Sequence, residues 1–263
     1  ADEVWTPSHY SRQAIINSGI NPDKVQVIPN GVDPELFTPD GDIYPLKTKK
    51  KFKLLFTGGT IYRKGIDILL KSYLRTFTAD DDVCLVIKDV GGDSFYKGQN
   101  ALEQIESIIN TENAPELEYI NEKLSENEMA SLYRACDVFV SPYRGEGFSL
   151  PTLEAMACGL YVMVTDGGST DDFVDESFAG IIPSKILNIG NIYADLELTD
   201  NATMLEVEEN TLCEMLREVY NNPSLIRTAG LKASYHARTN FSWQKSALKM
   251  MSRIDDIYSS NLA

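Results

Sequence analysis

Two carboxylates, Glu146 and Glu154, stand eight positions apart in the segment 144–159, which reads RGEGFSLPTLEAMACG. Glycines flank the first acid, and glycine lets the backbone approach a ligand closely. A helix is expected from about Leu150, because Pro151 suits the first helical turn. The free N–H groups of such a helix end form a site for an anion. The segment thus predicts a phosphate held between two hydroxyl-binding acids, which is the outline of a sugar nucleotide.

The same segment has a plainer interpretation. Leu153, Met156 and Ala157 are spaced as a buried helix face, and the glycines could simply serve turns. The rest of the chain has to decide between the two.

A basic pair, Arg63 and Lys64, follows the glycine turn Gly58–Gly59. A diphosphate needs positive charge, and Arg binds two oxygens at once while Lys supplies a point charge. The alternative is a solvated pair at a helix start, where the helix dipole makes cations mildly unfavourable. That penalty favours a role in binding.

Strand and helix patterns alternate through the middle of the chain. A capping box, Ser125 to Glu128, opens one of the helices. Strands are expected at 53–57, 83–87, 117–120, 138–141 and 161–165, and helices at 65–77, 97–110 and 125–135. This alternation predicts an α/β fold, a Rossmann-like parallel sheet with helices on both faces.

Ligands of such sheets bind beyond the carboxyl ends of the strands. The glycine loop after Thr57, Asn121, the loop after Ser141 and residues 166–168 all fall on that edge. Lys88 falls there too, and is expected to be a surface or strand-end lysine. The convergence of these loops predicts a site independently of any family.

The two ends of the chain are less regular. Residues 183–202 lack periodicity and are expected to be a loop or insertion before a helix at 206–220. Further helices are expected from Pro223 to Arg238 and, capped by Ser242, to Tyr258. The first 40 residues predict a strand at 3–6, a capped helix at 8–17 and a strand at 25–29, which is too little for an independent core.

Composition limits the partners. The 263 residues are 43% hydrophobic and carry a formal net charge of −15, which argues against nucleic acid as a partner. Four cysteines without a Cys-x-x-Cys pair are expected to be free buried thiols of a cytoplasmic protein, and with two histidines no zinc or other metal site is expected. No apolar run reaches the ~20 residues of a membrane span. The chain starts without methionine, so the true N-terminus is expected to lie elsewhere.

At the two-acid segment the chain resembles the retaining GT-B glycosyltransferases of family 4. The resemblance rests on four motifs in the family's order, which cover nearly the whole chain: VIPNGVD at 27–33, LLFTGGTIYRKGID at 54–67, SPYRGEGFSLPTLEAMACG at 141–159 and FSW at 241–243. It implies that residues 1–40 are a remnant of the N-terminal acceptor-binding domain with its linker, that 41–241 are the donor-binding half of a GT-B fold, and that 242–263 form the C-terminal helix.

The resemblance also implies residue roles. Glu154 resembles the acid that accepts hydrogen bonds from the ribose hydroxyls, and Glu146 the acid near the transferred sugar. The diphosphate would meet the catalytic pair Arg63 and Lys64. Further substrate contacts would come from Gly58, Gly59, Gly147, the main-chain N–H groups of Phe148, Ser149 and Leu150, and a base pocket of Ile120, Asn121 and Leu124. The family usually places its arginine directly after the first glycine, where this chain has Gly59.

The expected activity is transfer of a sugar from a UDP- or GDP-sugar type donor with retention of configuration, without a cofactor. The acceptor, a saccharide, lipid or protein, would bind mainly to the missing domain, so this chain alone would be inactive or weakly active. Two alternatives are a GT-B phosphorylase or epimerase relative and a non-catalytic sugar-nucleotide sensor or scaffold.

Overall fold

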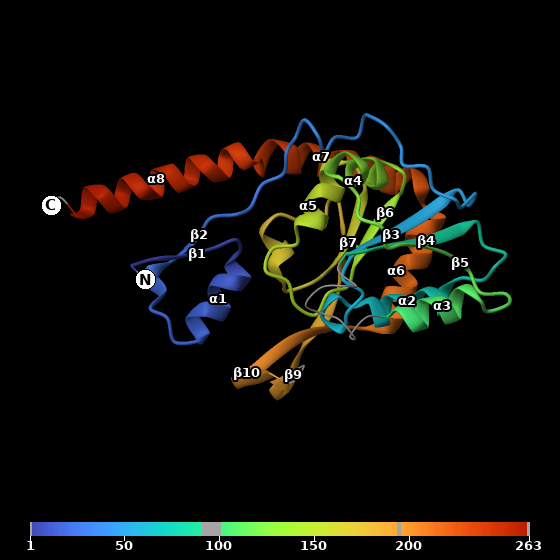
Figure 1. Ribbon diagram of the computed structural model, residues 1–263, viewed down its shortest axis with the longest axis horizontal. Coiled ribbons are helices and arrows are strands. Elements are labelled where there is room, and N and C mark those ends of the chain that lie inside the picture. The colour runs from blue at the N-terminus through green and yellow to red at the C-terminus, as the bar shows by residue number, and fades with distance from the viewer. Residues whose placement is uncertain (1, 91–100, 194–195, 262–263) are drawn as a thin grey trace.

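The computed structural model describes residues 2–90, 101–193 and 196–261. Its centre is a six-stranded parallel sheet of order β5-β4-β3-β6-β7-β8 (Figure 1). The strands are β3 (Phe52–Gly58), β4 (Val83–Asp89), β5 (Glu116–Ile120), β6 (Val138–Ser141), β7 (Tyr161–Thr165) and β8 (Gly180–Ile182). The predicted α/β sheet is confirmed.

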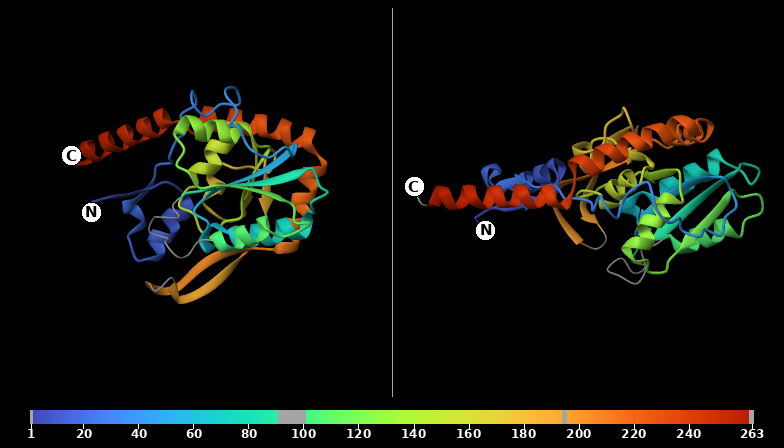
Figure 2. Two further views of the ribbon diagram at one scale, coloured as in Figure 1. Left: turned by 45° about the vertical axis from the view of Figure 1, so that its right-hand side comes forward. Right: turned by 90° about the horizontal axis from the view of Figure 1, so that it is seen from above.

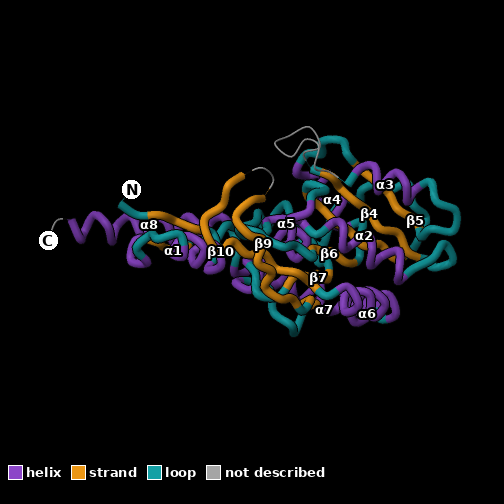
Figure 3. Tube along the Cα trace, turned by 90° about the horizontal axis from the view of Figure 1, so that it is seen from below, coloured by secondary structure: helices purple, strands orange, loops and turns teal. Residues whose placement is uncertain are grey.

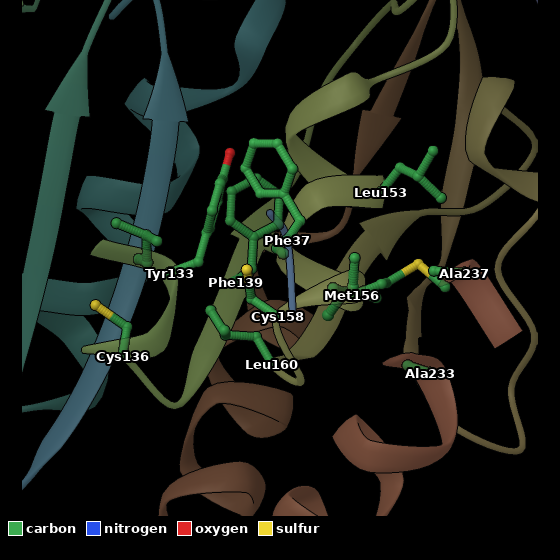
Figure 4. Packing of buried hydrophobic residues seen from close by; sticks show 14 of the residues in the cluster. Phe37, Tyr133, Cys136, Phe139, Leu153, Met156, Cys158, Leu160, Ala233 and Ala237 are labelled. Carbon is green, nitrogen blue, oxygen red and sulfur yellow. The ribbon is translucent and has the colours of Figure 1, made fainter. Parts of the chain in front are cut away.

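Helices cover both faces of this sheet. One face packs mainly on α4 (Glu126–Arg134), α5 (Leu150–Ala157) and α7 (Pro223–Asn240), and the other on α2 (Ile66–Thr76), α3 (Leu102–Ile109) and α6 (Glu209–Asn221). Because both faces are covered, every residue of β4 is buried. Figure 4 shows the first face, where Tyr133 of α4 lies against Phe37 and Phe139 with ring centroids 6.2 Å away in each case.

Local sequence explains these helices. The predicted buried face of α2, Ile66, Leu69, Leu70 and Tyr73, is buried. The capping box of α4 is present, with the Ser125 and Glu128 side chains each bonded to the other's main-chain N–H. Pro151 lies in the first turn of α5 as predicted.

The N-terminal residues form a separate unit. β1 (Val4–Thr6) and β2 (Val25–Val27) pair as a two-stranded parallel sheet, connected by α1 (His9–Asn17), whose N-cap is Ser8, and the 3-10 turn η1 (Pro22–Lys24). The long α8 (Trp243–Asn261) extends from the main body past this unit (Figures 1 and 2). Ser242 caps it, because the Ser242 hydroxyl accepts from the Lys245 N–H at 3.3 Å. Arg253 of α8 forms an ion pair with Glu3.

The expectation of an irregular loop at 183–202 is wrong. β9 (Ser184–Tyr193) and β10 (Leu196–Val207) form an antiparallel hairpin that projects from the sheet (Figure 3). Register shifts between Glu197 and Thr203 break the alternation of side chains, and the neighbours Ile186 and Leu187 are 75% and 40% exposed. With neither face consistently buried, the sequence carries no period of two.

Smaller differences follow from the same region. The helix expected from 206 begins at Glu209, because Glu206 and Val207 belong to β10. β8 was not predicted, since three residues carry too little pattern. The expected helix start at 97–100 lies outside the described residues.

Cys84, Cys136 and Cys158 are free and buried, whereas Cys213 is free and only half-buried. In the described part of the chain, no helix is long and apolar enough to cross a membrane.

Candidate active site

The loop after β3 and the loop after β6 meet at the carboxyl edge of the sheet. The first continues into the 3-10 turn η2 (Tyr62–Lys64) and the second into α5. The Arg144 N–H donates to the Arg63 carbonyl at 2.8 Å, and the Arg63 guanidinium donates to the Gly145 carbonyl at 2.6 Å. These bonds bring together the predicted basic pair and the predicted acid loop.

Glu146 lies against both members of the basic pair. Its carboxylate forms an ion pair with the Lys64 ammonium and another, at 3.1 Å, with the Arg63 guanidinium. The three side chains are only 10%, 16% and 29% exposed, respectively. The alternative of a solvated basic pair is therefore wrong.

Backbone geometry holds this turn in place. Gly65, which follows Lys64, has φ of +74°, and a Cβ there would lie 2.0 Å from the Pro142 carbonyl oxygen. Only glycine fits that space and that conformation. Gly58 also has a positive φ, of +142°. A Cβ atom on Gly58 would lie 3.5 Å from Cε of the Lys64 side chain, which passes beside this glycine.

The N-terminus of α5 opens beside this cluster. Ser149 takes a left-handed conformation, with φ of 71°, and its hydroxyl bonds to that of Thr152 instead of capping the helix. Among the described residues, the main-chain N–H groups of Phe148, Ser149 and Leu150 have no acceptor. Donors of this kind at a helix N-terminus attract an anion. The buried Phe148 ring, 4.9 Å from that of Phe173, anchors the loop.

Glu154 lies one turn inside α5, in a different environment. Its carboxylate accepts from the Tyr133 hydroxyl at 2.8 Å. Burial raises the pKa of Glu154 to about 7, against which the Tyr133 bond acts weakly. An acid that is poorly hydrated and has a free oxygen is suited to accept hydroxyl donors from a ligand.

The predicted base pocket is at the end of β5. Ile120 is buried, Asn121 is exposed and Leu124 is half-buried. Their contact with a base remains a prediction. Lys88, expected at the surface or a strand end, is at the end of β4 but is buried, so the surface part of that expectation is wrong.

Arg144 is a central residue of the site that sequence reasoning missed. Its buried guanidinium binds both carboxylate oxygens of Asp67 at 2.7 and 2.9 Å and both of Glu206 at 2.6 and 3.1 Å. It also donates to the Tyr62 carbonyl at 2.7 Å and lies 3.6 Å from the Tyr62 ring centroid. Arg144 thereby ties α2, η2 and the hairpin to the acid loop. Its position directly before the Gly-Glu-Gly segment was the available signal.

The N-terminal unit reaches the acid loop from the other side. The hydroxyls of Ser8 and Ser11 both donate to the Gly147 carbonyl, at 2.7 and 2.9 Å. The His9 main-chain N–H donates to the Asp172 carboxylate at 2.9 Å.

Taken together, these elements place two cations, main-chain donors and two carboxylates at one edge of the sheet, an arrangement (the anion cradle) that suits an anion flanked by hydroxyl groups. Positive charge comes from Lys64 and Arg63, and main-chain donors come from α5. Within the described ranges, no group of three or more His, Cys, Asp or Glu side chains is placed to hold a metal ion.

Comparison with known proteins relates the chain to a family. Residues 44–188 match the family described as Glycosyl transferases group 1. The chain is 28% identical over 248 residues to an uncharacterized glycosyltransferase of Methanocaldococcus jannaschii, covering 94% of this chain and 58% of that protein. It is also 28% identical to D-inositol 3-phosphate glycosyltransferase 1 of Catenulispora acidiphila, covering 91% and 53%.

Structural similarity extends over nearly the whole chain. The crystal structure of Anabaena HepE in complex with UDP and glucose superposes with a TM-score of 0.73 at 18% identity, covering 97% of this chain and 63% of that one. The chain thus spans little more than half the length of the curated relatives named above. On its sequence match, and with the fold in agreement, the chain belongs to the glycosyl transferases group 1 family.

Proposed function

We propose that this chain binds a nucleotide-diphosphate sugar and forms the donor half of a retaining glycosyltransferase. The observation that carries the proposal is the joint placement of Lys64, Arg63 and Glu146 at the open N-terminus of α5, with Glu154 one turn further in. Names printed for similar proteins support it: one relative is a D-inositol 3-phosphate glycosyltransferase, and one solved structure holds UDP and glucose.

In the proposed complex, the diphosphate lies between the basic pair and the α5 N–H groups. Negative charge grows on the diphosphate as the glycosidic bond breaks, so donors aimed there stabilise the transition state more than the ground state. Glu154 accepts the ribose hydroxyls, and Glu146, next to Lys64, faces the transferred sugar. With retention, the acceptor attacks from the face that the diphosphate leaves, and a phosphate oxygen takes the acceptor's proton.

The acceptor side belongs, in this proposal, to a further N-terminal domain, of which residues 1–40 are the end. Residues 41–241 are then the donor-binding domain and 242–263 its C-terminal helix. Because a GT-B cleft has two walls, the 263-residue chain is expected to bind a donor but to transfer sugar poorly alone. Efficient transfer by this chain to an added acceptor would contradict the two-wall assignment.

A titration of two ligands tests the donor site. Calorimetry with UDP and uridine, and with GDP and guanosine, should show that K64A loses affinity for the diphosphate and little for the nucleoside. The loss should be about 1.5–3 kcal/mol, the usual value of a bond to a charged group. R63A should behave in the same way to a lesser degree, because Arg63 also bonds the Gly145 carbonyl.

K51A serves as the matched control, since Lys51 is 90% exposed at the opposite end of β3. If K64A lost as much affinity for the nucleoside as for the nucleoside diphosphate, a phosphate role for Lys64 would be excluded. Absence of binding of any nucleoside diphosphate to the unmodified chain would refute the proposed function as a whole.

A further inference from the structure

A buried lysine at the ligand edge of the sheet has no role in the site as described so far. Lys88 occupies the second-last position of β4 and is only 3% exposed. In register it lies between Thr57 of β3 and Ile120 of β5. The three residues form one row across three neighbouring strands, one position before the ends of β3 and β4 and at the end of β5.

Strand alternation fixes the face on which this row lies. Leu55 and Val86, two positions before Thr57 and Lys88, pack in the cluster that contains Tyr133, while the intervening Phe56 and Ile87 pack on the opposite face. Because successive side chains alternate, Thr57 and Lys88 share the face of Tyr133, which is the residue that holds Glu154.

The Lys88 ammonium has few hydrogen-bond partners, although the Asp89 and Glu122 carboxylates attract its charge. The ammonium carries three donors, and in the described part of the chain it has one acceptor, the Asp89 carbonyl at 2.5 Å, and no ion pair. The Asp89 carboxylate is occupied elsewhere, since it accepts from the Thr60 hydroxyl at 3.1 Å and from the Tyr119 hydroxyl at 2.7 Å. Burial lowers the pKa of Lys88.

A second unsatisfied group lies beside it. The buried Thr57 hydroxyl lies near the Tyr133 hydroxyl but makes no hydrogen bond of good geometry among the described residues. Buried donors without acceptors cost folding free energy, and they are retained where a ligand supplies the missing partners. Lys88 and Thr57 therefore lack hydrogen-bond acceptors at the edge of the sheet where a ligand would bind.

The strand order indicates which part of a ligand would supply them. The anion cradle lies over β3 and β6, and the sheet continues from β3 to β4 and β5. A nucleotide with its diphosphate in the cradle and its ribose at Glu154 extends its base toward β4 and β5. Lys88 adjoins Ile120, the start of the predicted base pocket, and its flexible stem allows the ammonium to turn from the Asp89 carbonyl to a base.

We propose that Lys88 donates a hydrogen bond to the oxygen at C4 of uracil or C6 of guanine and thereby selects these bases over cytosine or adenine. At the equivalent ring position, uracil and guanine present an oxygen acceptor, whereas cytosine and adenine present an amino group, which an ammonium repels. The proposal rests on the proposed function, because it assumes that this edge binds a nucleotide.

Two pairs of ligands that differ at that group test the assignment. Calorimetric titration of the intact chain with UDP and CDP, and with GDP and ADP, should give at least about tenfold tighter binding of the keto member of one pair. K88M should weaken binding of that keto nucleotide by about tenfold or more and that of its amino counterpart by less than about threefold, so that the preference disappears. K88R keeps a donor and should keep the preference.

Several outcomes would overturn the proposal. If the wild-type protein binds the amino nucleotide of each pair as tightly as the keto nucleotide, it makes no such selection, whatever affinities K88M shows. An equal loss of UDP and CDP in K88M would assign Lys88 to the phosphate or ribose instead. If K88M does not fold, which a missing melting transition would show, the affinities of the wild-type protein and of K88R for the two nucleotide pairs decide the question. K51M, at the far end of β3, is the control for loss of a lysine charge.

The same titration separates this inference from the proposed function. Binding of all four nucleotides with no base preference would refute the role of Lys88 and leave the donor site standing. Binding of none of them would refute both.

Discussion

At the scale of single residues, two acids of the same type differ in their surroundings. Glu146 contacts two cations, whereas Glu154 is half-buried beside a tyrosine hydroxyl. An acid bonded to cations neutralises them, while a desolvated acid gains most from new hydrogen-bond donors. The two positions are therefore expected to respond differently to removal of the charge.

E154Q should weaken binding of both UDP and uridine by about 1.5–3 kcal/mol, because the ribose loses a charged acceptor. E146Q should bind UDP at least as tightly as the unmodified chain, since the charges of Lys64 and Arg63 become available to phosphate. Calorimetry on the two variants and the parent measures this. Similar losses in both variants would show that the acids do not have separate roles.

The pKa of Glu154 predicts opposite effects of pH on binding and stability. Burial raises this pKa from 4.5 to about 7, and ribose hydroxyls need the carboxylate, so affinity for uridine should rise between about pH 6 and 8. For the ligand-free chain, the native state holds more protons than the unfolded state between pH 4.5 and 7. The Glu154 contribution to stability is thus full below pH 4.5 and is lost as the pH rises through 7.

Denaturant unfolding of the parent and of E154Q at pH 5 and pH 8 checks the stability half. The difference between the two proteins should change by about 2–3 kcal/mol over this range, with the parent losing more stability on the alkaline side. No change would show that the pKa of Glu154 is unshifted, and a change of the opposite sign would show that it is lowered.

At the scale of secondary-structure elements, Arg144 joins pieces that are distant in sequence. It bonds Asp67 at the start of α2 and Glu206 in β10, and its own carbonyl accepts from the Leu205 N–H at 2.8 Å. Removing one partner of a buried ion pair leaves the other charges uncompensated. R144M should therefore destabilise the chain by about 3–5 kcal/mol and loosen the turn that holds Lys64.

Denaturant unfolding measures the loss, and a triple variant provides the control. R144M/D67L/E206L removes all three charges together, and should recover much of the stability, because well-packed apolar groups can replace a buried ionic cluster. UDP affinity should remain lowered in the triple variant if Arg144 positions Lys64. Full recovery of affinity with stability would limit Arg144 to a structural role.

Sequence patterns predicted elements whose reasons are local. The strands β3, β4, β6 and β7 are largely apolar runs, and Ser125 and Pro151 mark helix starts, so these elements could be placed from neighbours in the chain. The hairpin β9–β10 and the contacts of Arg144 depend on partners 60 or more residues away or on irregular register. Such features leave no periodic trace in the sequence.

The candidate site shows the same division. The alternation of strands and helices predicted that the loops carrying Lys64 and Glu146 would lie at one edge, but not that the two side chains would form an ion pair. The burial of Lys88 was missed because a lysine after an apolar strand usually ends in solvent.

At the scale of the whole molecule, the N-terminal unit and the main body meet at the acid loop. The chain carries a net charge of −15, so the local basic residues of the site, rather than the overall field, must attract an anionic ligand. The contact between the two parts combines packing of Tyr10 against the main core with hydrogen bonds at the acid loop. Ser8 and Ser11 share the Gly147 carbonyl, next to Glu146.

The variant S8A/S11A should release α1 from the acid loop without changing the main body. Losing the two bonds to the Gly147 carbonyl and the Ser8 N-cap bond, of about 1 kcal/mol each, should speed amide hydrogen exchange in α1 by about tenfold or more. Exchange in β3 and β6 should stay unchanged, because their contacts lie within the body. UDP affinity should change less than about twofold, since the proposed ligand groups are on η2 and α5.

S18A is the matched control for this experiment, because the Ser18 hydroxyl bonds only the Ala14 carbonyl within the same helix end, at 2.9 Å. It should affect exchange near residue 18 and leave the start of α1 protected. Unchanged exchange of α1 in S8A/S11A would mean that the bonds to Gly147 do not hold the unit in place. A large loss of UDP affinity would instead mean that the N-terminal unit sets the shape of the acid loop, and that the donor site is shared between the two parts of the molecule.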